Sequence, residues 1–444
     1  MADGWRDHYK ELFAAQQQRA AGEPGWLRTL RAGAFARFEE LGLPGRRDER
    51  WKYTSLRAFA ARRPTLPDLD GPLQDRPLDS ALPTLARLTN TDGQPDLGRS
   101  SLGLLPSNVL LQPVNELWDD VRAELEAQLE AVTDGLDALQ LALLQGGFAL
   151  RVGNDVELAE PVELLAELRT SGLIVPLVHV IDVGRHARAT VVTTWRGDAD
   201  GVHGGLTIAR VRDGGHLEQV TRQLQDTRSF RRVVTRVDLD RDAHYHSVQL
   251  SAGARTSRDD LHIRLNGSGG HAAMTALYLG HGQRHIDHHT VVEHLVPNAT
   301  SDQLYRTVLD DRSHAVFNGT IVVHRDAQST AAEQLNNNLL LTPTARVDTR
   351  PQLQIAADDV KCGHGATIGQ LDEEQLFYLM ARAIPRDTAQ AMLTFGFAEA
   401  AVDRIDHPTV REAIAATTRA WMATRLDTND HESAPPDVPD EVTP

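Results

Sequence analysis

The chain has 444 residues, 41% of them apolar, and a formal net charge of −16. This length predicts about three domains, or one long element with flanking parts, and it provides enough apolar side chains for a sizeable core. The negative charge argues against nucleic acid and against anionic membranes as the main partner.

The N-terminal residues are polar and lack the charged-then-apolar layout of a secretion signal. No apolar run approaches the ~18 residues that a membrane span needs, so we expect a cytoplasmic protein with no membrane partner. Residues 3–42 show two stretches of helical period, and the break between them falls at residues 22–25 (GEPG).

A short aromatic motif follows at residues 51–55 (WKYTS). Its rings could stack on a ligand or dock a partner, but packing against a β core is the preferred interpretation for these residue types. Residues 64–109 are rich in Pro, Asp and Gly and predict an irregular connection. Two further helices are predicted, around residues 117–132 and 136–144.

From Phe148 the hydrophobic period becomes that of strands, and this β character continues to about Ile368. Turn signals recur along it roughly every 13–15 residues. The pattern predicts either a large sandwich or barrel, or a solenoid in which each coil buries its inner face on its neighbours. Residues 336–338 (NNN) fit a ladder of stacked Asn in a solenoid, with an ordinary turn as the alternative.

After Gly369 the helical period returns in three segments, which begin near Asp372, Pro385 and Pro408. These segments predict a C-terminal helical region. From about Leu426 the chain is acidic and rich in Pro, which predicts a disordered tail.

The single cysteine of the chain, Cys362, excludes an intrachain disulfide and lies two residues before His364. On a strand, positions i and i+2 share a face, so the sulfur and the imidazole could contact one ligand. The neighbouring Lys361 would favour the thiolate, whereas Asp358 and Asp359 would oppose it. A lone cysteine is more often a buried small hydrophobe. Because an iron–sulfur cluster normally needs four protein ligands, this pair would have to be completed by other residues or by another chain.

Two other patterns could carry chemistry. The histidine-rich run with His281, His285, His288, His289 and His294 could bind zinc or iron, but surface or coil-stacking histidines are the favoured interpretation. The Gly-rich residues 266–271 (NGSGGH) precede a strand rather than a helix, so a hairpin turn is favoured over a phosphate site. No Walker motif is present, and we expect no ATP site in this chain.

Several segments carry a family resemblance. Residues 326–341, 355–367 and 375–382 resemble the SufB/SufD family of iron–sulfur cluster assembly proteins. Residues 49–56 (ERWKYTSL) resemble the signature of the SufD branch, and the single cysteine stands where chains of that branch have theirs.

This resemblance implies a mainly β fold with four parts. An N-terminal helical region with irregular connection would span residues 1–145, and a right-handed parallel β-helix (solenoid) core would span 146–370. A C-terminal helical domain that binds the ATPase SufC would span 371–425. The fourth part, residues 426–444, is the disordered acidic tail that the composition predicts.

The resemblance also implies a function. The chain would be a SufD-type, non-enzymatic subunit of the SufBCD scaffold, with SufC bound through the C-terminal helices and SufB through the β-helix. A homodimer would be possible without SufB. His364 and Cys362 would be metal ligands at the cluster-assembly interface, where a transient Fe–S cluster or iron is shared with SufB, and ATP would be used only through SufC.

Two alternatives stay open. The chain could be a SufB-like scaffold itself, although it lacks the further cysteines of that branch. It could also be a β-helix enzyme that acts on polysaccharide and uses paired carboxylates. For that role Asp259 and Asp260 are adjacent, but adjacent strand residues face opposite sides.

Overall fold

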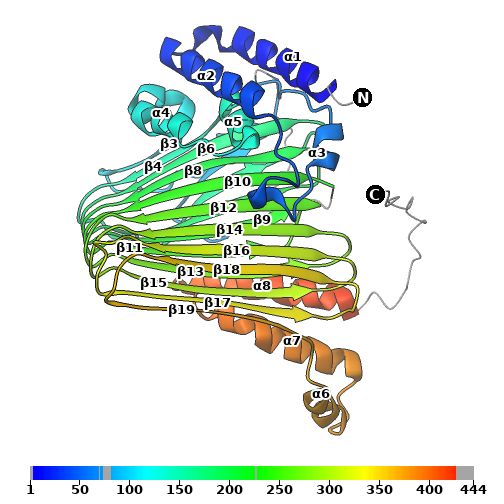
Figure 1. The fold of residues 1–444 in the computed structure, drawn as a ribbon. Coiled ribbons are helices and arrows are strands. Elements are labelled where there is room, and N and C mark those ends of the chain that lie inside the picture. Colours follow the sequence, from blue (N-terminus) through cyan, green and yellow to red (C-terminus); the bar gives the residue numbers. More distant parts are fainter. Residues whose placement is uncertain (1–3, 70, 74–81, 226–227, 427–444) are drawn as a thin grey trace.

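The computed structural model describes residues 4–69, 71–73, 82–225 and 228–426. A long stack of strands forms its centre, with the N-terminal helices at one end and the C-terminal helices at the other (Figure 1). Nearly all of the predicted disordered tail, from residue 427 on, lies outside the described residues. None of the helices in the described ranges combines the length and the apolar character that a membrane crossing requires.

Two sheets make up the stack, and each strand of one sheet is followed along most of the chain by a strand of the other. The ten-stranded sheet contains β1 (Ala86–Thr91), β2 (Gln94–Pro95), β5 (Val162–Glu167), β7 (Arg188–Gly197), β9 (His216–Gln225), β11 (His244–Ser251), β13 (His271–Gly280), β15 (Thr300–Leu309), β17 (Thr330–Leu340) and β19 (Val360–Gly369). The nine-stranded sheet contains β3 (Val109–Pro113), β4 (Gly146–Val152), β6 (Ile174–Val183), β8 (Val202–Val211), β10 (Phe230–Leu239), β12 (Thr256–Leu265), β14 (His285–His294), β16 (His314–Val323) and β18 (Arg346–Ile355).

Successive coils stack in parallel register. Thr256 pairs with His285 and His285 with His314, so these coils are 29 residues long. Each coil contains two strands and two corners, which explains why the turn signals recur at about half that interval. Of the two architectures that the β pattern predicts, the structure is therefore the solenoid, and the fold class implied by the family resemblance is confirmed as a mainly β protein with a parallel β-solenoid core.

Alternate side chains of each strand point into the lumen of the solenoid. Along β17 the residues Ala332, Gln334 and Asn336 are buried, whereas Glu333 and Leu335 between them are exposed. Inward apolar residues of both sheets meet in one continuous core, for example Tyr245, Ile263, Met274, Ile286 and Phe317. The two-residue alternation along each strand therefore determines which side chains face the lumen and which face outward.

The N-terminal helices cover the outer face of the nine-stranded sheet near the first coils (Figure 1). They are α1 (Gly4–Arg19), α2 (Gly25–Leu41), α3 (Arg57–Ala61), α4 (Arg122–Glu130) and α5 (Gly135–Ala142), with short 3₁₀ turns at Ala20–Gly22, Glu49–Trp51, Val114–Glu116 and Trp118–Val121. Phe38 and Phe59 belong to the same buried cluster as Val178 and Phe230 of the sheet, so this helical region and the solenoid share a core.

The aromatic motif at residues 51–55 packs against the β core, as its residue types predict. Trp51 is fully buried, and its Nε1 donates a hydrogen bond of 3.0 Å to Asp134 Oδ2. The Arg258 guanidinium lies over the Trp51 ring at 4.0 Å and donates to Asp287 Oδ2 at 2.9 Å. Thr54 donates to the same carboxylate oxygen at 2.5 Å. The motif therefore anchors the N-terminal region to strands β12 and β14.

The C-terminal helices are α6 (Glu373–Met380), α7 (Arg386–Val402) and α8 (Pro408–Leu426). Helices α7 and α8 cover the outer face of the ten-stranded sheet, where Ala398 and Ile414 pack in one cluster with Leu277, Leu279 and Val308. Helix α6 packs mainly against α7 and projects away from the stack (Figure 1).

Three local predictions differ from the structure. Within the predicted irregular connection, Ala86–Thr91 forms β1, which pairs in parallel with β5, and tertiary pairing overrides the loop-like composition around it. Residues 266–270 form a solenoid corner rather than a hairpin, because β12 and β13 belong to different sheets. A Cβ on Gly267 would lie 2.1 Å from the backbone nitrogen of Arg241, so stacked corners require glycine there.

The Asn run at residues 336–338 forms neither of its two predicted structures. It lies inside strand β17, and Asn338 Nδ2 donates to Asn336 Oδ1 at 2.8 Å and to the backbone oxygen of Thr367 on β19 at 2.9 Å. These bonds run along one strand and to the next coil's backbone, so identical side chains do not stack as a ladder.

One buried histidine in the lumen gives the fold a pH dependence. His179 stacks on Phe148 with ring centroids 5.1 Å apart and meets the Trp195 ring edge-on at 5.4 Å. Burial lowers the pKa of His179 to about 3. Below the unfolded-state pKa of about 6.5 the unfolded chain binds a proton that the folded protein excludes, so stability falls as the pH falls.

We predict that His179→Leu removes part of this pH dependence. Between pH 7 and pH 5 the wild-type protein should lose about 2 kcal/mol more unfolding free energy than the variant, at about 1.4 kcal/mol per pH unit below 6.5. Urea unfolding at the two pH values measures the difference. His364→Leu, at an exposed position, is the control, and an equal pH dependence in the His179 variant and the wild-type protein would contradict the prediction.

Candidate functional site

Cys362 and His364 lie on β19, the last strand of the ten-stranded sheet. In the parallel register, Cys362 pairs with Ala332 and His364 with Gln334 of β17. Because Ala332 and Gln334 point into the lumen, Cys362 and His364 project from the lumen face of β19. The two side chains thus share a face, as their spacing predicts, and that face is the interior of the final coil.

Side chains on the lumen face are more exposed in the final coil than in earlier coils. Cys362 is half-buried against the small cluster that includes Ile321, Val323 and Ala332, whereas His364 is exposed. Residues at equivalent lumen positions one coil earlier are fully buried, since β19 covers them. In the described residues no further strand follows β19 in its sheet, so its lumen side chains are accessible at the end of the solenoid.

Burial, rather than the neighbouring charges, decides the protonation of Cys362. Burial raises the pKa of the Cys362 thiol, and a backbone hydrogen bond from Ala332 only partly offsets this. Lys361, which was expected to favour the thiolate, is exposed and projects from the opposite face of the strand. The thiol is therefore protonated at neutral pH until a metal or another partner changes its surroundings.

Both sheets end at this side in long edge strands. β18 and β19 have 10 residues each, whereas the strands that end the two sheets at the opposite side, β2 and β3, have 2 and 5 residues. Large apolar side chains are exposed beside the edge, with Ile355 at 42% and Ile368 at 55%. A long edge with exposed apolar residues is a template for pairing with another chain. We refer to this surface, formed by β18 and β19, as the open end.

The histidine-rich run does not gather into one site. His285 and His289 of β14 project outward, His288 and His294 project into the lumen, and His281 lies in the corner before the strand. The strand therefore divides the run between two faces of the sheet.

Each of these histidines has its own local partner. His289 Nε2 lies 3.0 Å from Asp287 Oδ1, and His294 Nε2 lies 3.0 Å from Ser301 Oγ. His285 and His314, one coil apart, are in ring contact with centroids 4.7 Å apart. Burial lowers the pKa of both His285 and His294 to about 4. The contact between His285 and His314 is that of coil-stacking histidines, whereas His289 and His294 have polar partners on their own strand and on the next strand of the chain.

A polar cavity of about 410 Å³ lies on the outer face of the nine-stranded sheet, beneath the loop that carries the aromatic motif. His262 Nε2 lies 2.5 Å from Glu293 Oε1, and Arg350 forms an ion pair with Glu49. Charges of both signs pair with each other around the cavity, so it does not select a ligand of one charge.

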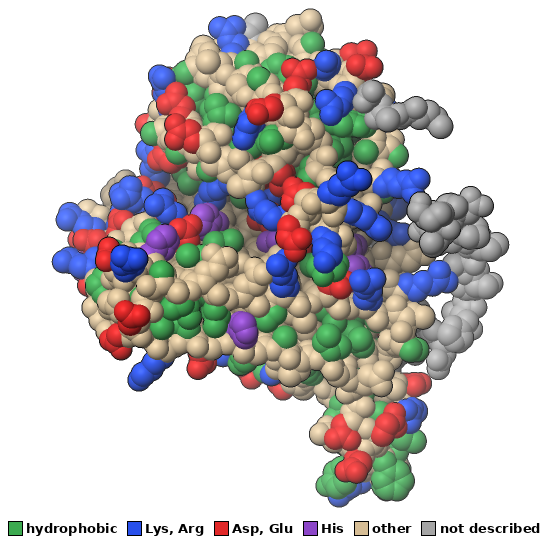
Figure 2. All heavy atoms as spheres, in the orientation of Figure 1, with side chains coloured by type: hydrophobic (Ala, Val, Ile, Leu, Met, Phe, Trp, Pro, Cys, Tyr) green, Lys and Arg blue, Asp and Glu red, His purple; other side chains and the backbone are tan. Residues whose placement is uncertain are grey.

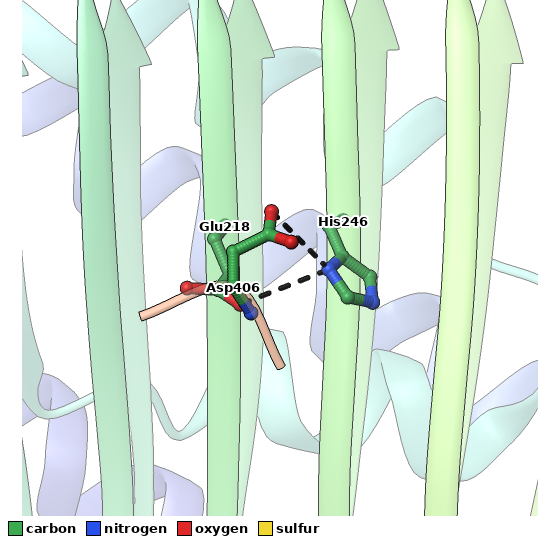
Figure 3. Close-up of side chains that lie close together, drawn as sticks. All are labelled: Glu218, His246 and Asp406. Carbon is green, nitrogen blue, oxygen red and sulfur yellow. Dashed lines mark hydrogen bonds and ion pairs between the residues drawn. The ribbon is translucent and has the colours of Figure 1, made fainter. Parts of the chain in front are cut away.

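Sequence reasoning missed one convergence of metal-binding residue types. Glu218 of β9, His246 of β11 and Asp406 of the α7–α8 connection meet where the C-terminal helices dock on the ten-stranded sheet (Figure 3). The three residues are far apart in the sequence, and only the parallel register of β9 and β11, with the return of the C-terminal helices, brings them together. The local sequence could not indicate this, because the three residues come from three separate parts of the chain.

The comparisons with known proteins agree with the resemblance. The family model described as "SUF system FeS cluster assembly, SufBD core domain" matches residues 169–397, and the "SufBD protein N-terminal region" model matches residues 4–63. The first match extends from strand β6 to helix α7 and includes both Cys362 and His364.

Three relatives illustrate the similarity. The iron-sulfur cluster assembly protein SufD of Escherichia coli is 30% identical over 367 residues, which cover 80% of this chain and 84% of the relative. An iron-sulfur cluster assembly SufBD family protein of Synechocystis is 27% identical over 89% of this chain and 92% of its own length. The iron-sulfur cluster assembly protein SufD of Bacillus subtilis is 25% identical over 89% of this chain and 93% of its own length.

We predict that Cys362 is alkylated slowly in the folded protein. At pH 8, iodoacetamide should modify it several-fold more slowly than in the urea-unfolded chain, because its half-buried thiol has a raised pKa. Mass spectrometry follows the reaction cleanly, since the chain has one cysteine. Lys361→Ala should leave the rate unchanged, and a folded-state rate equal to that of the unfolded chain would contradict the account of the thiol.

Proposed function

The chain belongs to the SufBD family of iron–sulfur cluster assembly proteins, and we propose that within it this protein is a SufD-type scaffold subunit with no catalytic turnover of its own. The observation that carries the proposal is the position of Cys362 and His364 in the accessible last coil. Two candidate ligands lie side by side at a surface suited to another chain.

A cluster at this site would need ligands from a partner. Cys362 and His364 supply one sulfur and one imidazole, whereas a cluster normally has four protein ligands. We infer that the iron or transient cluster is cargo, held between these two residues and ligands of SufB. The half-buried thiol would lose its proton on metal binding, which couples assembly to partner docking.

SufB would dock on the open end. Among the described residues no further strand pairs with the outer edges of the two ten-residue strands, and exposed Ile355 and Ile368 would become buried when another chain pairs there. The same surface can pair with a second copy of this chain when SufB is absent, which supports a homodimer as the alternative assembly.

SufC would dock on the projecting helix α6. Its apolar side chains Phe377, Tyr378 and Met380 are 74%, 57% and 40% exposed. Figure 2 shows hydrophobic side chains gathered on this projection. Such a concentration of exposed apolar surface marks an interaction site. ATP would then act only through SufC, in line with the absence of a Walker motif from the sequence.

Helices α7 and α8 would connect a SufC molecule bound to α6 with the sheet that carries the cluster ligands. They pack on the outer face of the sheet whose last strand carries Cys362 and His364. We infer that ATP hydrolysis in SufC moves the C-terminal helices and the subunits, and that this movement opens the SufB interface to iron and sulfur.

The alternative functions have less support. Asp259 projects into the lumen, where it pairs with Arg231 at 2.6 Å, and Asp260 projects outward, where it pairs with Arg232 at 2.5 Å. Two buried, separately paired carboxylates on opposite faces do not suit a polysaccharide-cleaving enzyme. A SufB-like role would need a second thiol to accept sulfur, and the chain has one cysteine.

We predict that His364→Ala lowers the cluster yield several-fold when the chain is co-expressed with SufB and SufC and the complex is reconstituted. The complex itself should still form, because the exposed imidazole contributes little to folding. Absorbance and iron and sulfide content measure the yield. Thr367→Ala, on the other face of β19, is the control. Failure of any complex to form with the wild-type chain would reject the proposed function, and an unchanged yield would remove His364 from the site.

A second prediction concerns SufC. Phe377→Asp places a charge in the exposed apolar surface of α6 and should abolish co-purification of SufC while SufB still binds. Leu104→Asp is the matched control, because Leu104 is 94% exposed and lies far from α6 in the sequence. If SufC binds the Phe377 variant as well as it binds the control, the SufC contact lies elsewhere.

A further inference from the structure

The cluster of Glu218, His246 and Asp406 has the spacing of metal ligands. His246 Nδ1 lies 3.7 Å from Glu218 Oε1 and 3.7 Å from Asp406 Oδ2 (Figure 3). Both distances are longer than a hydrogen bond. Ligand atoms that surround a zinc ion at about 2.0–2.2 Å lie about 3.3–3.6 Å from one another in a tetrahedral site. The ligand atoms of all three side chains lie within 4.8 Å of one another, close enough to surround one ion.

The second nitrogen of His246 is already engaged. His246 Nε2 lies 3.1 Å from Thr275 Oγ1. When Nε2–H donates to this hydroxyl, the neutral imidazole presents the lone pair of Nδ1 to the side of the two carboxylates, where the nitrogen and the carboxylate oxygens can bind one cation together. A metal-binding histidine typically has its other ring N–H fixed by a hydrogen bond of this kind.

Glu218 is held in place by groups that leave lone pairs available. Its Oε1 accepts the backbone N–H of Asp406 at 2.6 Å, and its Oε2 accepts the N–H of His407 at 3.2 Å and the hydroxyl of Thr190 at 3.2 Å. An ionised carboxylate has about four acceptor positions, so the oxygen that faces His246 can still bind an ion. These hydrogen bonds therefore orient the Glu218 carboxylate and leave lone pairs on it for a metal ion.

We propose that Glu218, His246 and Asp406 bind one divalent first-row ion, with Zn²⁺ as the probe. One imidazole and two carboxylates are ligands that such ions accept. The bound ion would fasten the α7–α8 connection to strands β9 and β11, and so fix the C-terminal helices on the solenoid. This site is on the outer face of the sheet and is separate from Cys362 and His364 in the lumen of the final coil.

The test is calorimetric titration of the chelator-treated full-length chain with Zn²⁺ alone. A Cys362→Ser, His364→Ala background removes the cluster ligands, and we expect one tight equivalent to remain. His246→Gln and Asp406→Asn should each abolish it. The side chain of Asp406 is 74% exposed, so its variant tests the site without a folding defect. Thr275→Val should weaken binding about 10- to 100-fold.

His271→Gln is the matched control, since His271 lies on the neighbouring strand β13 and outside the cluster. It should retain the tight equivalent. The proposal is overturned if the background protein binds no tight equivalent, or if the Asp406 variant binds Zn²⁺ as the background protein does. Because the titration uses the chain without SufB or SufC, its outcome is independent of whether the proposed scaffold complex forms.

Discussion

The structure depends on the hydrogen bonding of one coil's backbone to the next. Within the stack, each strand is satisfied by parallel neighbours one coil away on either side. A solenoid therefore has two ends at which this bonding must stop. At the first end the sheets finish in short antiparallel strands, β2 and β3, whereas at the last end two full-length strands have edges that no further strand of the described residues pairs with. The difference between the ends gives the molecule one surface suited to strand pairing.

The same constraint explains where the chemistry lies. Lumen residues of inner coils are covered on both sides, and polar groups there pair with one another, as Arg231 does with Asp259. The last coil has lumen side chains that another protein can reach, and these include Cys362 and His364. Their partial exposure is thus a consequence of coil position. The role in SufC binding proposed for α6 has a different structural basis. This helix packs mainly on α7 rather than on the stack of strands, so several of its apolar side chains stay exposed.

The sequence predicts much of this fold because strand and helix periods are local. The long β region, the three C-terminal helices and the shared face of Cys362 and His364 follow from spacing alone. The pKa of Cys362 does not, since burial by a neighbouring coil outweighs the adjacent Lys361. Strand β1 was missed because its partner β5 lies far away in the sequence. Glu218, His246 and Asp406 meet only through strand register and helix docking, which no local pattern encodes.

We propose that SufB binds the open end. Hydrogen–deuterium exchange of the chain, alone and with SufB, tests it most directly, because free edge amides exchange quickly until a partner covers them. SufB binding should protect backbone amides of β18 and β19, with little change in strands β6 to β12. Protection confined to the outer faces of the sheets, with unchanged exchange in β18 and β19, would contradict it.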